Sequence, residues 1–340
     1  MSGKGRRPYI PILHGVLDAS RPDERDTILQ AEEIAQSLEL LGCRTTVIGC
    51  GLSDRKIERL ADSRPSAVFN LVEAIGGEGR LAAIVPTLLA ARGCRFTGSG
   101  ASAYVSTMDK LFTKRVLAEA DLPTPRFWRH GGAVEPRGRV IVKSVWEDAS
   151  FGIDRFSVVE GRNARALMAR KAQELGGEWF AEAFIEGREF NVSVLDGPAG
   201  PEVLPLAEIE FRDFAADKPR IVDFEAKWVE GSHAFHNTPR RFLIAGEDDF
   251  LAQRLRSLAL RCWQLFGLEG YARIDFRVDE KGRPWIIEIN ANPCLSRDAG
   301  FFAAAQQAGL THEDMIRRIL VAAGLAETAL RPNRVVETAA

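Results

Sequence analysis

Residues 271–293, which read YARIDFRVDEKGRPWIIEINANP, decide the fold of this chain. Polar and apolar residues alternate along residues 271–278, which is the pattern of a half-buried strand. Residues 284–289 are strongly apolar and form a second strand candidate, and the intervening segment DEKG has the composition of a turn. The stretch therefore predicts a β-hairpin whose second strand is internal to a sheet.

The polar residues of this hairpin fall on one side of it. Asp275 shares a strand face with Arg273, and Glu288 shares one with Asn290, because residues two apart in a strand point the same way. If the hairpin closes, two carboxylates and an amide oxygen converge, and such oxygen ligands suit Mg²⁺ held partly by phosphate. A surface hairpin with its polar face in water is the alternative. Glu288 ends a buried strand, where an unpaired charge is costly, and this favours the metal.

The composition of the chain favours some protein classes over others. Its 340 residues are 46% hydrophobic and 27% charged, with a net charge of −2, which favours a globular protein of two or three domains and neither a nucleic acid nor a membrane as partner. We find no apolar run long enough to span a bilayer and no signal-peptide pattern, and the five scattered cysteines fit reduced thiols, so we expect a cytoplasmic location. Cys294, close to the hairpin, is read mainly as a small space-filling residue.

The first hundred residues alternate between strand and helix patterns, which predicts an α/β unit with a parallel sheet. The strand candidates are residues 9–13, 45–48 and 67–71, and the helix candidate is 26–41. Ligands of such sheets bind beyond the carboxyl ends of the strands, which selects as candidate substrate contacts His14, Asp23, Glu24, Glu73 and Glu78. Residues 76–79 favour a flexible loop over a phosphate loop, because no Lys-Ser/Thr pair follows.

The remainder of the chain mixes helix and strand patterns. We expect a helix over residues 107–120 capped by Thr107, a strand over 139–143, a helix over 162–175, strands over 179–185 and 187–195, edge strands over 204–211 and 223–228, a helix over 249–266 with Phe250 and Leu265 in its buried stripe, and a helix from Thr311 capped with Asp314.

Taken in order, these motifs resemble the ATP-grasp enzymes and, within them, the D-alanine–D-alanine ligase family. The similarity runs from about residue 69 to residue 320 and rests on segments 69–70, 96–100, 108–110, 122–125, 142–143, 185–190, 224–227, 273–276 and 288–290. It implies a three-domain α/β (α+β) fold. The implied ranges are an N-terminal parallel-sheet domain (1–100), a central ATP-grasp lid subdomain (101–180), a C-terminal catalytic subdomain (181–330) and a tail (331–340).

The resemblance also implies roles for single residues. It implies contacts to ATP from Lys110 and Lys143 at the phosphates, Glu182, Ala183 and Ile185 at the adenine, Glu189 at the ribose, Ser150, Phe151 and Gly152 in a lid, and Lys227 near the γ-phosphate. It implies that Asp275, Glu288 and Asn290 hold two Mg²⁺ ions, with Mn²⁺ as a possible substitute. Catalytic roles fall to Arg273, Lys227 and Glu24, and the implied assembly is a homodimer.

The implied reaction is amide formation from a carboxylate and an amine through an acylphosphate, with small amino-acid or peptide-like substrates. Several positions depart from the family. Ala149, Trp228 and Ala299 replace hydroxyl-bearing residues, Glu73 replaces a histidine, and Glu24 alone keeps its identity. Lost hydroxyls remove hydrogen bonds to a small zwitterion, and Arg297 and Asp298 offer charge beside Ala299, so we expect at least one substrate other than D-alanine.

Three alternatives remain open at this point: D-alanine–D-alanine ligase itself, a nucleotide-binding ATP-grasp module without catalysis, and a kinase-like enzyme that releases a phosphorylated product. The two carboxylates of the hairpin argue against the non-catalytic module, because a protein that only binds nucleotide does not need them.

Overall fold

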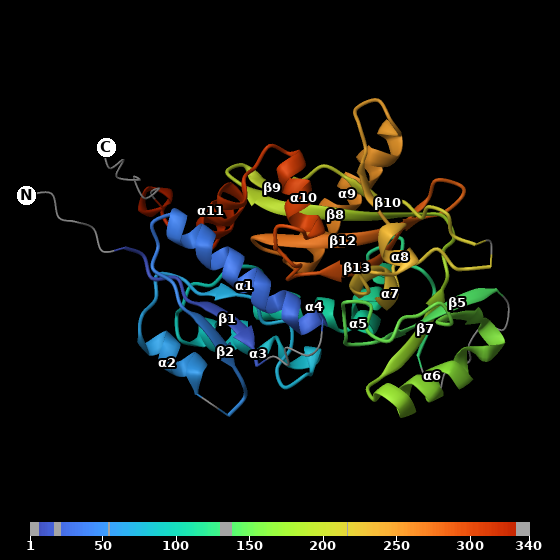
Figure 1. Ribbon diagram of the computed structural model, residues 1–340, viewed down its shortest axis with the longest axis horizontal. Helices are drawn as coiled ribbons and strands as arrows, with labels where there is room; N and C mark the ends of the chain where they lie inside the picture. The colour runs from blue at the N-terminus through green and yellow to red at the C-terminus, as the bar shows by residue number, and fades with distance from the viewer. Residues whose placement is uncertain (1–6, 17–21, 54, 130–137, 216, 331–340) are drawn as a thin grey trace, which may run out of the picture.

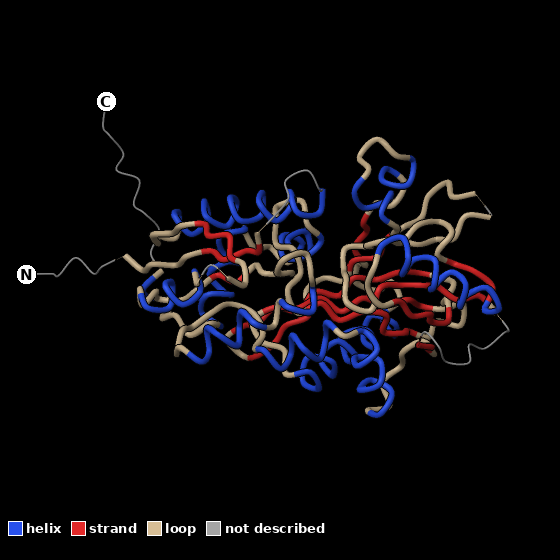
Figure 2. Tube along the Cα trace, turned by 90° about the horizontal axis from the view of Figure 1, so that it is seen from below, coloured by secondary structure: helices blue, strands red, loops and turns tan. Residues whose placement is uncertain are grey.

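The computed structural model describes residues 7–16, 22–53, 55–129, 138–215 and 217–330, without the side chains of residues 22–24. Three sheets follow one another along the chain (Figure 1). Figure 2 shows that the strands lie inside the molecule, with helices along its outer faces. None of the helices described is long and apolar enough to cross a membrane.

The first sheet is parallel, as the alternating pattern predicted. Its central strand β1 (Ile12–Gly15) lies between β2 (Val47–Cys50) and β3 (Phe69–Asn70). Four helical segments belong to this part of the chain: α1 (Pro22–Leu40), α2 (Lys56–Asp62), η1 (Gly79–Leu81) and α3 (Ile84–Ala91). The carboxyl ends of the strands point toward the rest of the molecule, where the cleft described below opens.

The second sheet is antiparallel and has the order β4-β7-β5-β6. It consists of β4 (Phe127–Arg129), β5 (Arg139–Ser144), β6 (Val158–Glu160) and β7 (Trp179–Ala183), and α6 (Gly161–Leu175) packs on β5 and β7. β7 runs across residue 180, where we expected a domain boundary, and stays in this sheet. The domain ranges themselves remain a prediction.

The third and largest sheet carries the hairpin. Its strands are β8 (Arg188–Gly197), β9 (Gly200–Val203), β10 (Ala207–Ile209), β11 (Arg240–Phe242), β12 (Tyr271–Val278) and β13 (Pro284–Asn290), in the order β11-β10-β8-β12-β13 with β9 beside β8. The prediction that β13 is internal is wrong, because β13 forms an edge. A neighbouring segment covers this edge, with the amide of Ile286 donating to the Pro123 carbonyl (2.7 Å) and the Thr124 hydroxyl to the Ile286 carbonyl (3.0 Å).

The helix predicted over residues 107–120 is two helices, α4 (Ala101–Met108) and α5 (Lys110–Glu119). Thr107 is therefore not a cap, because it lies inside α4, where its hydroxyl donates to the Ala103 carbonyl (2.8 Å). Asp109 caps α5 instead, and its carboxylate accepts from the amides of Leu111 and Phe112. The break puts Lys110 at the first position of a new helix.

Residues 223–228 are also helical rather than an edge strand. They form α7 (Phe224–Trp228), because the Asp223 side chain caps it by accepting from the Ala226 amide (2.9 Å). A short α8 (His233–His236) follows, and the edge strand beyond β10 is β11.

The last helices are α9 (Asp249–Phe266), α10 (Gly300–Gln307) and α11 (His312–Ala322), with η2 (Glu327–Ala329) near the end. Of these helices, α9 and α11 were predicted from the sequence and α10 was not. The capping box of Thr311 and Asp314 is present at α11. The side chains of Phe250 and Leu265 on α9 are 77% and 40% exposed, so their placement in a buried stripe is wrong.

Gly187 generates a test of this fold. It joins β7 to β8 with φ +132°, and a Cβ there would overlap the carbonyl oxygen of Val278. Gly200 also has a positive φ (+111°) but open space around it. We expect Gly187→Ala to lower the free energy of unfolding by about 3 kcal/mol or more, and Gly200→Ala by about 1–2 kcal/mol, since only the first adds a clash to backbone strain. Equal losses in denaturant titrations would contradict the packing of Gly187 against β12.

Candidate active site

A cleft of about 650 Å³ is lined by residues from all three sheets. Most of the residues selected from the sequence line it: Glu73, Lys110, Lys143, Ser150, Phe151, Glu182, Ala183, Ile185, Glu189, Lys227, Trp228, Arg273, Asp275, Glu288, Asn290, Asp298 and Ala299. Gly152 and Arg297 are not among the lining residues. The side chain of Glu24 and the tail after residue 330 lie outside the described residues.

The floor of the cleft is the closed hairpin. Asp275 of β12 pairs with Glu288 of β13, and Arg273 pairs with Asn290. A bulge follows Asp275, so the register shifts beyond this pair. The Arg273 guanidinium grips the Asp275 carboxylate with two bonds of 2.8 Å, and Asn191 of β8 donates to the same carboxylate (2.9 Å). The hairpin thus holds two carboxylates side by side with a cation on one of them.

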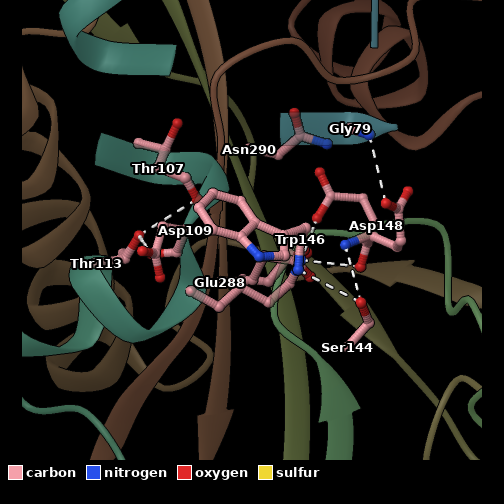
Figure 3. Close-up of polar contacts among 12 residues, drawn as sticks. Gly79, Thr107, Asp109, Thr113, Ser144, Trp146, Asp148, Glu288 and Asn290 are labelled. Atoms are coloured by element: carbon pink, nitrogen blue, oxygen red, sulfur yellow. Dashed lines mark hydrogen bonds and ion pairs between the residues drawn. The ribbon is translucent and has the colours of Figure 1, made fainter. Parts of the chain in front are cut away.

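Lys110 supplies a second cation from the start of α5. Its Nζ lies 2.5 Å from Asp148 Oδ1, 2.9 Å from the Glu147 carbonyl and 3.5 Å from Glu288 Oε1. Burial alone would lower the pKa of Lys110, but Asp148 and Glu288 outweigh it and raise this pKa. Burial raises the pKa of Asp148, although Lys110 opposes this. Figure 3 shows Asp148 and Glu288 facing each other near Asn290.

Glu182 of β7 is a buried carboxylate between two lysines. Lys143 Nζ lies 2.5 Å from its Oε1, and Lys114 of α5 forms an ion pair with Oε2 that is not aligned as a hydrogen bond. The side chains of Glu182 and Lys114 are each 2% exposed. Burial alone would raise the pKa of Glu182, but the two lysines outweigh it and the pKa is lowered. Glu182 is therefore held as an anion by charge from two elements.

Glu189 of β8 is paired with Arg277 of β12, whose Nη1 lies 2.9 Å from Glu189 Oε2. The same guanidinium donates to the carbonyls of Ile185, Gly187 and Arg220. Arg277 therefore fixes both the carboxylate and the backbone that joins β7 to β8.

The loop at residues 147–153, which contains the three predicted lid residues, is tied to the region around α7. The Ser150 hydroxyl donates to the Val222 carbonyl (2.8 Å), and the indole of Trp228 donates to the Ala149 carbonyl (3.0 Å). Ala149, Ser150 and Gly152 have positive φ values of 57°, 61° and 63°. A Cβ on Gly152 would lie 2.8 Å from Leu175 Cδ1, so this loop needs glycine there.

The far end of the cleft holds the candidate substrate contacts. Arg297 points away from it, donating from its amide to Glu33 (2.6 Å) and pairing with Glu313 (2.9 Å). Cys294 does line the cleft, but burial raises the pKa of its thiol, which disfavours the thiolate that a nucleophile needs.

The other early candidates are less central. His14 bonds to the carbonyl of the adjacent Gly15 (2.6 Å), and Glu78 pairs with Arg80 at the surface, so neither is among the lining residues.

Several residues of the site were not selected from the sequence: Arg277, Asp148 and Arg240 line the cleft, and Lys114 is buried against Glu182. Lys114 lies one helical turn after Lys110, and Arg277 continues the alternation of Arg273 and Asp275, so spacing could have indicated both. Asp148 and Arg240 carried no local signal, because only the tertiary fold brings them to the cleft.

The acidic residues of the floor form no complete metal site by themselves. In the part of the chain that the structure describes, no group of three or more His, Cys, Asp and Glu side chains is arranged to hold a metal ion. Asp275, Glu288 and the Asn290 amide provide oxygen donors alone, which suits a hard cation whose remaining ligands come from a bound molecule.

Comparisons with known proteins find a family, relatives and solved structures that are similar to this chain. Residues 138–321 match the family described as "D-ala D-ala ligase C-terminus". The chain is 32% identical to D-alanine–D-alanine ligase of Moorella thermoacetica over 90% of its own length and 97% of the relative's. It is also 32% identical to an uncharacterized protein, y4sG, of Sinorhizobium fredii, over 74% of this chain and 73% of that protein.

A solved structure shares the fold at low sequence identity. The crystal structure of D-alanine–D-alanine ligase from Bacillus anthracis complexed with ATP aligns with a TM-score of 0.72 and 18% identity, covering 94% of this chain and 98% of that one.

The buried charges yield a stability prediction. We expect Lys114→Met to lower the free energy of unfolding at pH 8 by about 3 kcal/mol, because Glu182 keeps its charge but loses one partner. The pKa of Glu182 is depressed in the folded protein, so its stabilising contribution exists above the unfolded pKa and is lost as pH falls. The effect of the substitution should therefore shrink only as pH falls below 4.5, the ordinary pKa of a glutamate, through the depressed pKa of Glu182. Lys281→Met, in the exposed hairpin turn, is the control. If Lys114→Met lost no more free energy of unfolding at pH 8 than this control, the pairing of Lys114 with Glu182 would be contradicted.

Proposed function

The chain belongs to the D-alanine–D-alanine ligase family, and from this membership we propose that it is an ATP- and Mg²⁺-dependent ligase that joins a carboxylate to an amine. The observation that carries the proposal is the closed hairpin, which sets Asp275 against Glu288 with Arg273 and Lys110 as their cations. Such an arrangement suits phosphoryl transfer, in which positive charge must surround the moving group.

The chemistry requires activation of the acid, because a carboxylate is a poor target for an amine. In the proposed first step a carboxylate oxygen attacks the γ-phosphorus of ATP, the bond to the bridging oxygen breaks, and ADP leaves. The amine nitrogen then attacks the acyl carbon of the acylphosphate, loses a proton and expels phosphate. Water would hydrolyse this intermediate, so the loop at residues 147–153 has the role of covering it.

Residues of the central and large sheets are proposed to hold ATP. Glu182 and the backbone of Ala183 and Ile185 would contact the adenine, and Glu189 the ribose. Lys110, Lys143 and Lys227 would contact the phosphates. Lys110 is paired with the Asp148 carboxylate, and Lys143 with the Glu182 carboxylate. These pairs support the assignment of both lysines, because each already binds negative charge inside the cleft.

The donor set fits Mg²⁺. Asp275, Glu288 and Asn290 would hold it through oxygen atoms, and phosphate oxygens would complete the coordination. When bound, the ion neutralises charge on the phosphates during transfer. We propose two ions, with Mn²⁺ as a possible substitute, on family resemblance. The same resemblance leads us to propose a homodimer. We also propose a cytoplasmic location, because the reaction needs ATP.

The substrate pocket supports a partner other than D-alanine. Ala149 and Ala299 offer no hydroxyl, and Trp228 is held by its bond to the Ala149 carbonyl, so the wall it forms is apolar and fixed. A site that lacks hydrogen-bond partners for a small zwitterion loses affinity for it. D-alanine–D-alanine ligase itself is the second candidate, favoured by the relative that matches over nearly its full length.

Substrate choice can be tested directly. ADP release would be measured with ATP, Mg²⁺ and pairs drawn from a panel of D- and L-amino acids, and amide products identified by mass. We expect a pair that includes a residue other than D-alanine to give the highest kcat/KM, by about tenfold or more. Turnover of D-alanine above all other amino acids would instead identify the second candidate. A phosphorylated acid without amide product would indicate kinase-like chemistry.

The role of the floor can be tested in the same assay. Glu288→Gln keeps the shape of the side chain and removes its charge, so we expect kcat to fall about 100-fold or more with an unchanged circular dichroism spectrum. Glu280→Gln, in the exposed turn of the same hairpin, should leave kcat unchanged. A fully active Glu288→Gln enzyme would favour the non-catalytic nucleotide-binding module.

A further inference from the structure

Arg240 differs from the other arginines of the cleft. The cleft is lined by Arg240, Arg273 and Arg277, and the latter two are held by Asp275 and Glu189. The guanidinium of Arg240 has neither an ion pair nor a hydrogen bond among the described residues. Its neighbour Arg241 is bound by three glutamates, so the unpaired state belongs to Arg240 and not to β11 as a whole.

The surroundings of Arg240 are unfavourable for a cation without a partner. Partial burial and the nearby charge of Arg273 lower the pKa of Arg240, while Asp298 opposes them without reaching ion-pair distance. The Asp298 carboxylate is itself engaged by the Ser296 hydroxyl (2.7 Å). Keeping a guanidinium near a like charge at a partly closed wall costs free energy, and an anion bound to Arg240 would recover it.

A second feature lies against Arg240. The backbone of α10 starts at Gly300, and a Cβ on that glycine would be 3.0 Å from Arg240 Nη2 and 3.3 Å from Nε. The guanidinium therefore fits against the start of α10 because residue 300 has no side chain. The preceding residue, Ala299, makes no side-chain cap, so the first amides of the helix have no side-chain acceptor. An anion at this position would meet a guanidinium and the end of a helix together.

We propose that Arg240 binds the carboxylate of the amine substrate, and hence that this substrate is an α-amino acid with a free carboxylate. The inference rests on the proposed ligase function. The reacting carboxylate must lie beside Arg273 and the metal-binding floor, so an anion held at Arg240 is a different one. An α-amino acid carries its carboxylate on the same carbon as its amine, so a carboxylate bound at Arg240 would keep the amine within the cleft that the floor also lines.

Arg240, which lies on a different element from Ala299, would thus bind the carboxylate in place of the hydroxyl that Ala299 lacks. A guanidinium binds a carboxylate through two parallel bonds and does not depend on a small side chain next to it. This subsite accounts for how the cleft can recognise an amino acid after losing the hydroxyls of the family, and it leaves the wall at Trp228 free to accept a larger side chain.

The test compares amino acids with their carboxamides as amine donors. The probes are glycine and glycinamide, D- and L-alanine with their alaninamides, and D- and L-phenylalanine with their phenylalaninamides. We expect the wild-type enzyme to prefer the best acid over its amide by about 30- to 100-fold in kcat/KM. Arg240→Gln should lose this preference, mainly through a higher KM for the acid, with little change for the amide. Arg240→Lys should keep part of it.

Two further variants separate binding from folding. Gly300→Ala places a methyl group against the guanidinium while keeping a backbone that any residue adopts, and we expect about a three- to tenfold loss for the acid only. Arg170→Gln, on the exposed side of α6, should change nothing. The Tm of ligand-free Arg240→Gln should equal or exceed that of the wild type, because the substitution breaks no bond and removes a like-charge neighbour of Arg273.

A readout without turnover distinguishes this proposal from the proposed function. With Mg²⁺ and ADP present, at least one acid of the panel should raise the Tm of the wild type more than its carboxamide does, and Arg240→Gln should abolish that difference. This result supports the subsite even if no amide product forms. The absence of product would count against the proposed ligase function and not against the subsite. The proposal is overturned if no acid shows the difference or if Arg240→Gln retains it.

Discussion

The pairing of β12 with β13 is the constraint on which the rest of the site depends. Antiparallel register puts Asp275 directly opposite Glu288, and like charges at paired positions repel each other. The fold compensates with Arg273 from the same strand and Lys110 from a different part of the chain. The helix break at Asp109 places Lys110 there, so a capping residue far from the hairpin serves the same charge balance.

The same reasoning applies further along the cleft, where each buried carboxylate has a cation from another element. Glu182 lies between Lys114 and Lys143, so α5 and two strands of the second sheet are joined by charge around one side chain. Removing one partner from such a group costs more free energy than the intact ion pair contributes to stability. These contacts are therefore better guides to site geometry than to stability. Arg240 lacks a compensating partner among the described residues, which is why we propose it as the site of a substrate anion.

Much of the fold could be predicted from the sequence, since the alternation of the hairpin, the helical stripe of α9 and the cap at Thr311 are local patterns. The errors arose where a distant partner decides the outcome. Asp223 folds its segment into a helix, and residues 122–125 cover an edge strand that reads as internal. Arg297 and Arg240 show the same limit within the candidate site. Sequence position favoured Arg297 beside Ala299, but Glu313 holds it, and the edge of the sheet supplies Arg240 instead.

We propose that the floor formed by β12 and β13 directs a phosphoryl group onto a carboxylate. The most direct measurement uses an acid substrate labelled with ¹⁸O in both carboxylate oxygens, with the inorganic phosphate and the amide analysed by mass. We expect one labelled oxygen in the phosphate and one in the amide for each turnover, because the C–O bond to phosphate breaks when the amine attacks. Phosphate free of label, formed together with amide product, would contradict it.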